Sequence, residues 1–226
     1  MITSLHIIGV KGQETNVMDE IKKYASFETE VIANGKRENL KTILVKRGVE
    51  GDYDKYTFNT EEVQQVNGRL GTKKIKDIVV PKQYLFIYNS KTKIVLLSGN
   101  RRDANHFFYL LQERLTEKSK IELYHKTIDI QKLIKKSYDI KGASFKNLQI
   151  ETLKGTLIWG QNVNNTTDYL RYDKNGNLSS LIIFFNHKNM DIKTNISSNG
   201  TVSFYTSLDF KDLVDFLETL IFPNAF

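Results

Sequence analysis

The sequence predicts an α+β fold of antiparallel sheets, with amphipathic helices packed on one face. Short segments of alternating apolar and polar residues recur with Gly and Asn turns between them, which is typical of antiparallel strands. Two longer segments carry apolar residues at helical spacing, and each of them follows a strand pair. The chain has 226 residues, 40% hydrophobic and 26% charged, which is long enough for one large domain or two small ones.

The first 66 residues predict a strand, a helix and a hairpin, followed by more polar segments. Asn16 is the expected N-cap of the helix, because its side chain can accept a hydrogen bond from the first turn. Asn34 and Gly35 supply the hairpin turn, since both residue types tolerate positive φ. The expected elements are a strand at 5–10, a helix at 16–25, strands at 28–33 and 40–47, a loop at 48–54, a strand at 56–59 and a helical turn at 60–66.

The clearest pattern is a hairpin followed by a helix. Apolar runs at 84–88 and 93–97 flank polar turn residues, which predicts two paired strands. Residues 103–115 then place Phe107 and Leu111 on one apolar stripe, which predicts an amphipathic helix.

Beyond residue 118 the sequence predicts a strand, a short helix with Asp129 as its cap, and a meander closed by a second helix. The turns at 174–177 and 198–200 both contain Asn-Gly, which favours tight hairpins. The expected elements are a strand at 121–128, a helix at 129–136, strands at 144–152, 156–163, 169–172, 178–186, 191–196 and 201–206, and a helix at 209–222.

Two hairpin-helix units, at 93–115 and 201–221, have a similar layout. One interpretation is an internal repeat, and the alternative is that a common arrangement occurs twice independently. The predicted organisation has three parts. They are an N-terminal α+β unit at 1–117, a basic connecting segment with a short helix at 118–142, and a C-terminal antiparallel meander with its closing helix at 143–226.

Positive charge is concentrated in the middle of the chain. The formal net charge is +7, but 26 of the 33 basic residues are lysines, which is typical of AT-rich coding and says little about partners. Residues 67–102 carry nine basic residues against Asp77 alone, and residues 118–154 carry nine against four acids. The distribution of charge is therefore more informative than its total.

The first basic block predicts a surface for a phosphate backbone. Its segment 67–76 combines two glycines, which permit close backbone approach, with four cations that can neutralise phosphates. It lacks the Gly-Lys-Ser/Thr ending of a Walker loop, and the alternative is a solvated lysine-rich loop. The predicted nucleic-acid-binding residues are Arg69, Lys73, Lys74, Lys76, Lys91, Lys93, Arg101 and Arg102.

A second basic group is interpreted as a solvated face in preference to a binding surface. It consists of Lys132, Lys135, Lys136, Lys141 and Lys146, the first three at the spacing of one helix face.

The aromatic residues also have two interpretations. Tyr84, Tyr88 and Tyr109 offer rings for base stacking, and core or cross-strand packing is the alternative. Trp159, the single tryptophan, is expected in the core of the second sheet.

No catalytic, metal or cofactor site is predicted. Acid-x-Lys pairs of the type found in metal-dependent nucleases occur about as often as composition alone gives; Asp191 and Lys193, with Asp173 upstream, are the best placed. The histidines show no paired metal-ligand spacing. The lack of cysteine excludes disulfides, thiolate ligands and cysteine nucleophiles.

These patterns lead to three functional hypotheses. The first is a non-enzymatic nucleic-acid-binding protein of a low-GC bacterium or phage, with DNA favoured over RNA. The alternative is a protein-interaction module, such as an inhibitor or accessory subunit in phage defence, that uses a sheet edge or the apolar tail at 222–226. The third is a metal-dependent nuclease. A cytoplasmic location without membrane contact is expected, because the sequence shows neither a signal-peptide pattern nor an apolar run of membrane length.

Overall fold

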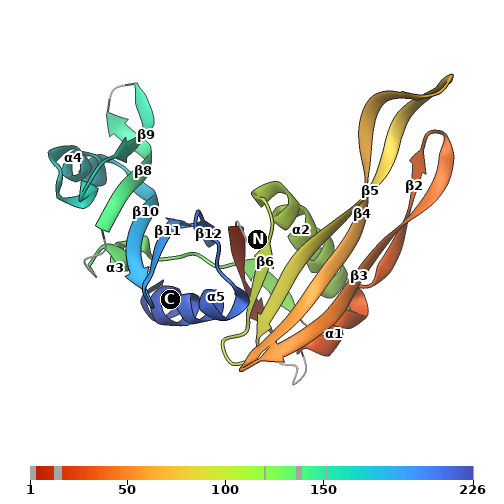
Figure 1. Cartoon of the computed structure of the whole chain (residues 1–226), viewed down its shortest axis with the longest axis horizontal. Helices are drawn as coiled ribbons and strands as arrows, with labels where there is room; N and C mark the ends of the chain where they lie inside the picture. The colour runs from red at the N-terminus through yellow and green to blue at the C-terminus, as the bar shows by residue number, and fades with distance from the viewer. Residues whose placement is uncertain (1–3, 13–16, 120, 136–138, 151, 226) are drawn as a thin grey trace. The chain divides into compact units, whose positions relative to one another are not determined.

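The first strand, β1 (Ser4–Lys11), is shared between two units of the chain. A computed structural model describes residues 4–12, 17–119, 121–135, 139–150 and 152–225 (Figure 1). One unit is Gly9–Tyr124, and the other combines Met1–Ile8 with His125–Phe226. Both units contain helices and antiparallel strands, which confirms the predicted mixture of helix with antiparallel sheet.

In the unit Gly9–Tyr124, long strands follow one another as antiparallel neighbours, in the order β2-β3-β4-β5-β6. The end of β1 joins this sheet beside β6, where the Val10 N–H donates to the Lys93 carbonyl at 2.9 Å. The elements are α1 (Val17–Tyr24), β2 (Phe27–Ala33), β3 (Lys36–Glu50), β4 (Tyr53–Leu70), β5 (Lys73–Asn89), β6 (Ile94–Ser98), α2 (Arg101–Lys118) and β7 (Glu122–His125).

Helix α2 packs on this sheet through aromatic rings. Its Phe107 ring lies 4.1 Å from the ring of Phe58 and 5.9 Å from that of Phe86, and all three side chains are buried. The helix begins after Asn100, whose side chain accepts from the Asp103 N–H at 2.9 Å. Burial of these rings is the main local source of stability, because apolar burial is the dominant favourable term in folding.

In the second unit, β1 pairs with β12 and the sheet continues in the order β12-β11-β10-β8-β9. The elements are α3 (Ile130–Ile134), β8 (Asp139–Ile150), β9 (Leu153–Trp159), a 3-10 turn (Val163–Asn165), α4 (Thr167–Asn175), β10 (Asn177–His187), β11 (Met190–Ser197), β12 (Thr201–Phe204), α5 (Phe210–Phe216), a π-helical segment (Leu217–Ile221) and α6 (Phe222–Ala225).

The closing helix contains a wide turn. Asp209 caps α5 by accepting from the Asp212 N–H at 2.8 Å. The chain then adopts π-helical hydrogen bonding over Leu217–Ile221 before α6. The predicted helix at 209–222 is therefore present, but a π segment interrupts its α-helical pattern.

Several predicted elements are confirmed. The Asn34-Gly35 turn joins β2 to β3 with φ values of +50° and +73°. The hairpin of 84–88 with 93–97 forms from the end of β5 and β6. Gly200, with φ of +82°, lies in the predicted turn between β11 and β12. The expected N-cap Asn16 lies outside the described residues, and Asp129 stands at the start of α3 without a side-chain capping bond.

In the first unit, two predictions of local structure are wrong. Residues 60–66, predicted as a helical turn, belong to β4 and pair with β5. Val63 and Val66 imitate helical spacing, but the cross-strand partners decide the conformation. The predicted loop at 48–54 is mostly strand, with β3 ending at Glu50 and β4 beginning at Tyr53.

In the second unit, residues 169–172 were expected as a strand but form part of α4. Thr166 caps this helix by accepting from the Tyr169 N–H at 3.2 Å. The predicted hairpin turn at 174–177 is instead the end of α4, and Gly176 has an extended backbone with φ of −158°. The capping threonine is the signal that the strand prediction overlooked.

No helix within the described ranges has both the length and the apolar character needed to cross a lipid bilayer. The division at residues 117 and 142 and the internal repeat remain predictions.

Candidate nucleic-acid interface

The outer ends of β4 and β5 form a two-stranded ribbon that extends past α1 and α2 (Figure 1). Leu70 pairs with Lys73 across the two-residue connection Gly71-Thr72. Gly71 has φ of +62°, which glycine adopts without the steric penalty of a Cβ. The segment 67–76 is therefore a hairpin tip with paired strands, and both the phosphate-binding surface and the solvated lysine-rich surface remain hypotheses for it.

Four predicted binding residues gather on this ribbon. Arg69 and Lys74 are direct cross-strand partners, and Lys76 lies on the same face because side chains alternate along a strand. Lys73 lies on the opposite face beside Leu70. All four cations are exposed, and within the described residues none of them forms an ion pair. We call Arg69, Lys73, Lys74 and Lys76 the ribbon cations.

A bulge separates the tip from the rest of the ribbon. The pairing register shifts between Gln65 and Gly68, so that Val66 and Asn67 lie opposite Lys76. An extra residue in one strand bends that strand and increases its twist. A hollow of about 570 Å³, lined in part by Asn67 and Lys76, lies at this position.

The turn of the β2–β3 hairpin braces the ribbon just behind its tip. The Asn34 side-chain oxygen accepts from the N–H groups of Lys76 and Asp77 at 3.0 and 3.1 Å, and its amide donates to the Asp77 carbonyl at 2.5 Å. The Asp77 carboxylate in turn accepts from the Asn34 N–H at 2.9 Å. The single acid of the 67–102 block thus takes part in the brace.

The other predicted binding residues lie elsewhere in the unit. Lys91 and Lys93 lie in the turn at the opposite end of β5, which places them roughly 50 Å from the ribbon tip at ~3.3 Å per strand residue. Lys91 forms an ion pair with Asp52 at 2.5 Å. Arg101 and Arg102 are exposed in the first turn of α2. The eight predicted residues therefore occupy three places.

The second basic group includes residues that are already ion-paired. Lys132 lies 3.8 Å from Asp129, and Lys141 lies 2.7 Å from Asp139. Lys146 is exposed, and Lys136 lies outside the described residues.

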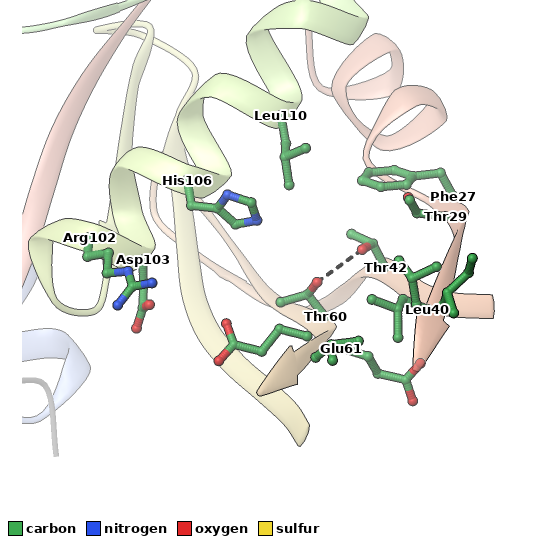
Figure 2. Close-up of a pocket in the computed structure, with 14 residues that line it drawn as sticks. Phe27, Thr29, Leu40, Thr42, Thr60, Glu61, Arg102, Asp103, His106 and Leu110 are labelled. Carbon is green, nitrogen blue, oxygen red and sulfur yellow. Dashed lines mark hydrogen bonds between the residues drawn. The ribbon is translucent and has the colours of Figure 1, made fainter. Parts of the chain in front are cut away.

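A groove of about 590 Å³ lies between α2 and the concave side of β2–β4 (Figure 2). The strands contribute apolar side chains such as Phe27 and Leu40, together with the hydrogen-bonded pair Thr42 and Thr60 at 3.0 Å. The helix contributes charged and polar groups, among them Arg102 and His106. The volume of the groove is that of a small-molecule site. Among its described lining residues, however, no nucleophilic side chain is hydrogen-bonded to a base.

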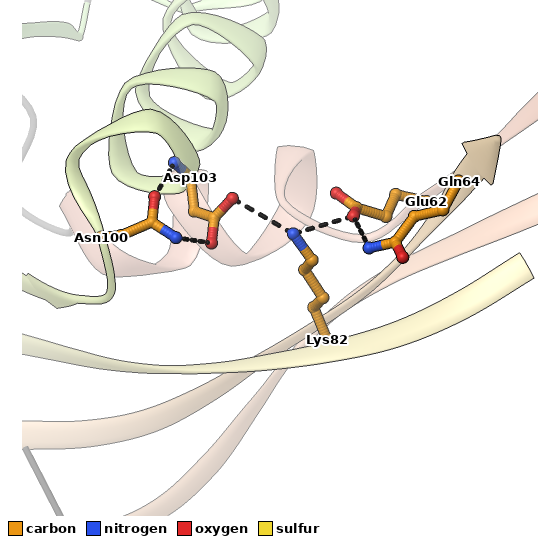
Figure 3. Close-up of polar contacts among 5 residues, drawn as sticks. All are labelled: Glu62, Gln64, Lys82, Asn100 and Asp103. Atoms are coloured by element: carbon orange, nitrogen blue, oxygen red, sulfur yellow. Dashed lines mark hydrogen bonds and ion pairs between the residues drawn. The ribbon is translucent and has the colours of Figure 1, made fainter. Parts of the chain in front are cut away.

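Lys82 joins the helix to the sheet at the edge of this groove (Figure 3). Its ammonium group lies 2.8 Å from Glu62 and 3.2 Å from Asp103. Asn100 donates to Asp103 at 2.7 Å, and Gln64 donates to Glu62 at 2.6 Å. These contacts give Lys82 a structural role, in contrast to the ribbon cations.

The protonation of this cluster follows from its contacts. The hydrogen bond to Glu62, reinforced by the one to Asp103, raises the pKa of Lys82 above its ordinary value. Partial burial raises the pKa of Glu62, but the hydrogen bonds from Gln64 and Lys82 outweigh it and hold that pKa below the ordinary value. Burial, with Asp103 nearby, raises the pKa of Tyr84 to about 12. The cluster therefore remains charged across neutral pH.

The predicted stacking tyrosines differ in exposure. Tyr88 is buried, Tyr84 is half-buried, and Tyr109 on α2 is exposed. Trp159, which the sequence placed in a core, is 57% exposed on the edge strand β9. That prediction is wrong, because Trp159 shares the outer face of β9 with Leu157, which is also exposed.

The carboxylates singled out in the sequence lie on different elements of the second unit. Among the residues that the structure describes, no group of three or more His, Asp and Glu side chains is arranged to hold a metal ion. Asp191 lies on β11, whereas Asp173 lies on α4 and accepts from Gln131 at 2.9 Å. His187 contacts the Asp215 carboxylate at 2.6 Å, and Lys188 shares the same carboxylate oxygen at 2.8 Å.

The sequence was compared with protein-family models and with curated proteins, and it matches neither a family model nor a curated protein.

Proposed function

We propose that the chain is a non-enzymatic nucleic-acid-binding protein of a low-GC bacterium or phage, and that it contacts a DNA phosphate backbone through the ribbon cations. The observation that carries the proposal is that these four cations have no acidic partner among the described residues. Two other cations of the 67–102 block are engaged: Lys82 with two carboxylates and Lys91 with Asp52.

Binding to a phosphate has a different free-energy cost for paired and for unpaired cations. A lysine that already forms an ion pair must break it to reach a phosphate, whereas an unpaired and exposed lysine exchanges only water and counterions. A two-stranded ribbon also fits the major groove of B-DNA. In this proposal the helices pack on one face of the sheet and support the base of the ribbon.

A salt titration of duplex DNA binding tests the proposal. If all four ribbon cations neutralise phosphates, log Kd should change with log salt concentration by a slope of magnitude about 3.6, at ~0.9 per contact. Replacing Lys73, Lys74 and Lys76 together by Gln should weaken binding about tenfold or more at low salt and remove about three quarters of the slope. The measurement is fluorescence anisotropy on two duplexes of unrelated sequence, which should respond alike.

A charge-matched control separates a defined site from diffuse attraction. Lys132, Lys135 and Lys174 are exposed lysines on or beside α3 and α4, and their joint replacement by Gln removes the same charge. This control should change affinity less than about twofold. Equal losses in the two triple variants would contradict the ribbon site. No measurable wild-type binding at about 50 mM salt would overturn the proposal and favour the protein-interaction module.

A further inference from the structure

The sheet of the second unit has two unlike faces. Helices contact one face through ring pairs: Phe145 of β8 lies 5.3 Å from Tyr169 of α4, and Phe204 of β12 lies 5.3 Å from Phe216 of α5. Side chains alternate along strands, so the residues next to Phe145 and Phe204 point to the opposite, outer face. This outer face carries the exposed rings.

Trp159 lies on this outer face, over Gly142. It is the cross-strand partner of Gly142, which in turn pairs with Ile182 of β10. A Cβ atom added to Gly142 would lie 2.9 Å from the indole ring and 3.2 Å from Ile182. The absence of a side chain at Gly142 therefore lets the indole rest on the sheet while more than half of it stays exposed.

Two more rings and one lysine complete the arrangement. Phe184 and Lys193 are cross-strand partners, and the Tyr205 N–H donates to the Lys193 carbonyl at 3.0 Å, so the three residues form one row across the sheet. The Lys193 ammonium lies 5.1 Å from the rings of Trp159 and Phe184 and 4.9 Å from that of Tyr205. These distances are those of cation–π contacts.

The surroundings of the rings are polar and contain further cations. The outer face includes serine pairs such as Ser144 with Ser180, and the two residues lie in the row that begins at Leu157. Lys146 is exposed on the same face, and the ammonium of Lys141, which is ion-paired with Asp139, lies 5.9 Å from the Phe184 ring.

We infer that this aromatic face binds single-stranded nucleic acid, with unpaired bases stacked on Trp159, Phe184 and Tyr205 and with Lys193 beside the backbone. Base stacking on sheet aromatics is tolerant of sequence, and neighbouring cations follow the phosphates. A protein interface is a poorer fit, because the centre of such a patch is usually depleted of charge, whereas here Lys193 lies between the rings. The inference concerns a second site, in a different unit from the ribbon, and it shares with the proposed function only the class of ligand.

Trp159 provides the test, because it is the single tryptophan of the chain. The full-length protein is titrated with oligothymidylate and oligouridylate of about 12 nucleotides while tryptophan emission is recorded. Stacked bases should quench the emission and saturate. An abasic oligonucleotide of equal length and a blunt duplex should leave the emission unchanged, since neither offers a free base face.

Variants assign the effect to the aromatic face. Tyr205→Ala, at a side chain that is 58% exposed, should raise Kd for the single strand about tenfold. The Lys73, Lys74 and Lys76 triple variant should retain quenching by the single strand, which separates this inference from the ribbon proposal. The comparison of normal with abasic strands requires no variant, so it remains decisive even if a substitution disturbs folding.

The outcomes divide clearly. Quenching by oligothymidylate alone, or by oligouridylate alone, supports the site and shows which of the two strands, which differ in the sugar and in the 5-methyl group of the base, it prefers. Absence of quenching by both strands at low salt would overturn the inference. Equal quenching by the abasic strand would also overturn it, because the contact would then be with the phosphates alone.

Discussion

The two ends of β5 carry lysines in opposite surroundings. At the outer end, Lys73 and Lys74 are exposed without an acidic partner among the described residues. Just beyond the inner end, Lys91 is paired with Asp52, and the Lys93 ammonium donates to the Gly12 carbonyl at 3.4 Å. Lysines of one basic block therefore have different surroundings: those just beyond the inner end have hydrogen-bonding partners, and those at the outer end are exposed without an acidic partner among the described residues.

The largest expected effect is a loss of unfolding free energy, and it should differ between substitutions at the inner and outer ends of the strands. Phe86→Ala removes a fully buried ring at the inner end and should lower the free energy of unfolding by about 3–5 kcal/mol. Leu70→Ala removes a side chain that is 73% exposed at the outer end and should change it by less than about 0.5 kcal/mol. Urea denaturation measures both. A large loss for Leu70→Ala would show that the tip is packed against something and is not free.

The next effect concerns Lys82, which lies between the two ends. Lys82→Met keeps most of the apolar stem but leaves Glu62 and Asp103 without their shared cation. The loss of unfolding free energy should be about 2 kcal/mol near neutral pH. Chemical denaturation of both proteins measures it, and an unchanged midpoint would contradict the structural role of Lys82.

The pH dependence of that loss has a definite sign. The pKa of Glu62 is lowered in the folded state, so its contribution is present above the ordinary value of 4.5 and disappears as the pH falls through the lowered pKa. The pKa of Lys82 is raised, so its contribution is complete below 10.5 and disappears as the pH rises through the raised pKa. The difference between wild type and Lys82→Met should therefore be largest between about pH 5 and 10 and should shrink at both extremes.

A smaller effect is expected from the brace behind the tip. Asn34→Gly keeps the positive φ of the turn but removes the side chain that bonds to Lys76 and Asp77. Because these bonds are exposed, the loss should be about 1 kcal/mol. Hydrogen exchange of the Lys76 and Asp77 amides should accelerate, whereas amides of β6 should be unaffected. Unchanged exchange at both positions would exclude the brace.

The smallest effect is that of a single ribbon cation. Arg69→Gln should reduce the slope of log Kd against log salt concentration by about one and weaken binding of every duplex alike. The matched control is Arg37→Gln, at an exposed arginine in the β2–β3 hairpin that pairs with Glu30 at 3.6 Å. The control should leave the slope unchanged. A slope change confined to one DNA sequence would instead indicate base readout.

Local pattern was enough to predict much of the fold. The Asn34-Gly35 turn and the hairpin before α2 follow from residue types that few other conformations accommodate. The strand β4 was harder to predict over residues 60–66, because none of these residues is buried and the stretch therefore lacks an alternation of buried and exposed side chains. Pairing with β5 decides that conformation, and the pairing is a tertiary property.

The candidate sites, like the fold, were predicted from the sequence only in part. The sequence identified the ribbon cations by their density, but it grouped them with Lys91 and Arg101, which the long strand β5 and the turn after it keep apart. It placed Trp159 in a core because large aromatic residues are usually buried. The exposed position of Trp159 depends on Gly142 and Ile182, which come from two other strands and become neighbours only in the folded sheet.

The shared strand β1 has a consequence for the order in which the two units fold during synthesis. Ser4 and Ser203 are hydrogen-bonded at 2.9 Å although 199 positions separate them, so the sheet of the second unit is complete only after residue 203 has been synthesised. Gly9–Tyr124, by contrast, is a continuous segment that can acquire its contacts as it leaves the ribosome. We therefore expect the unit Gly9–Tyr124 to fold first, and residues 4–8 to pair with β12 only afterwards.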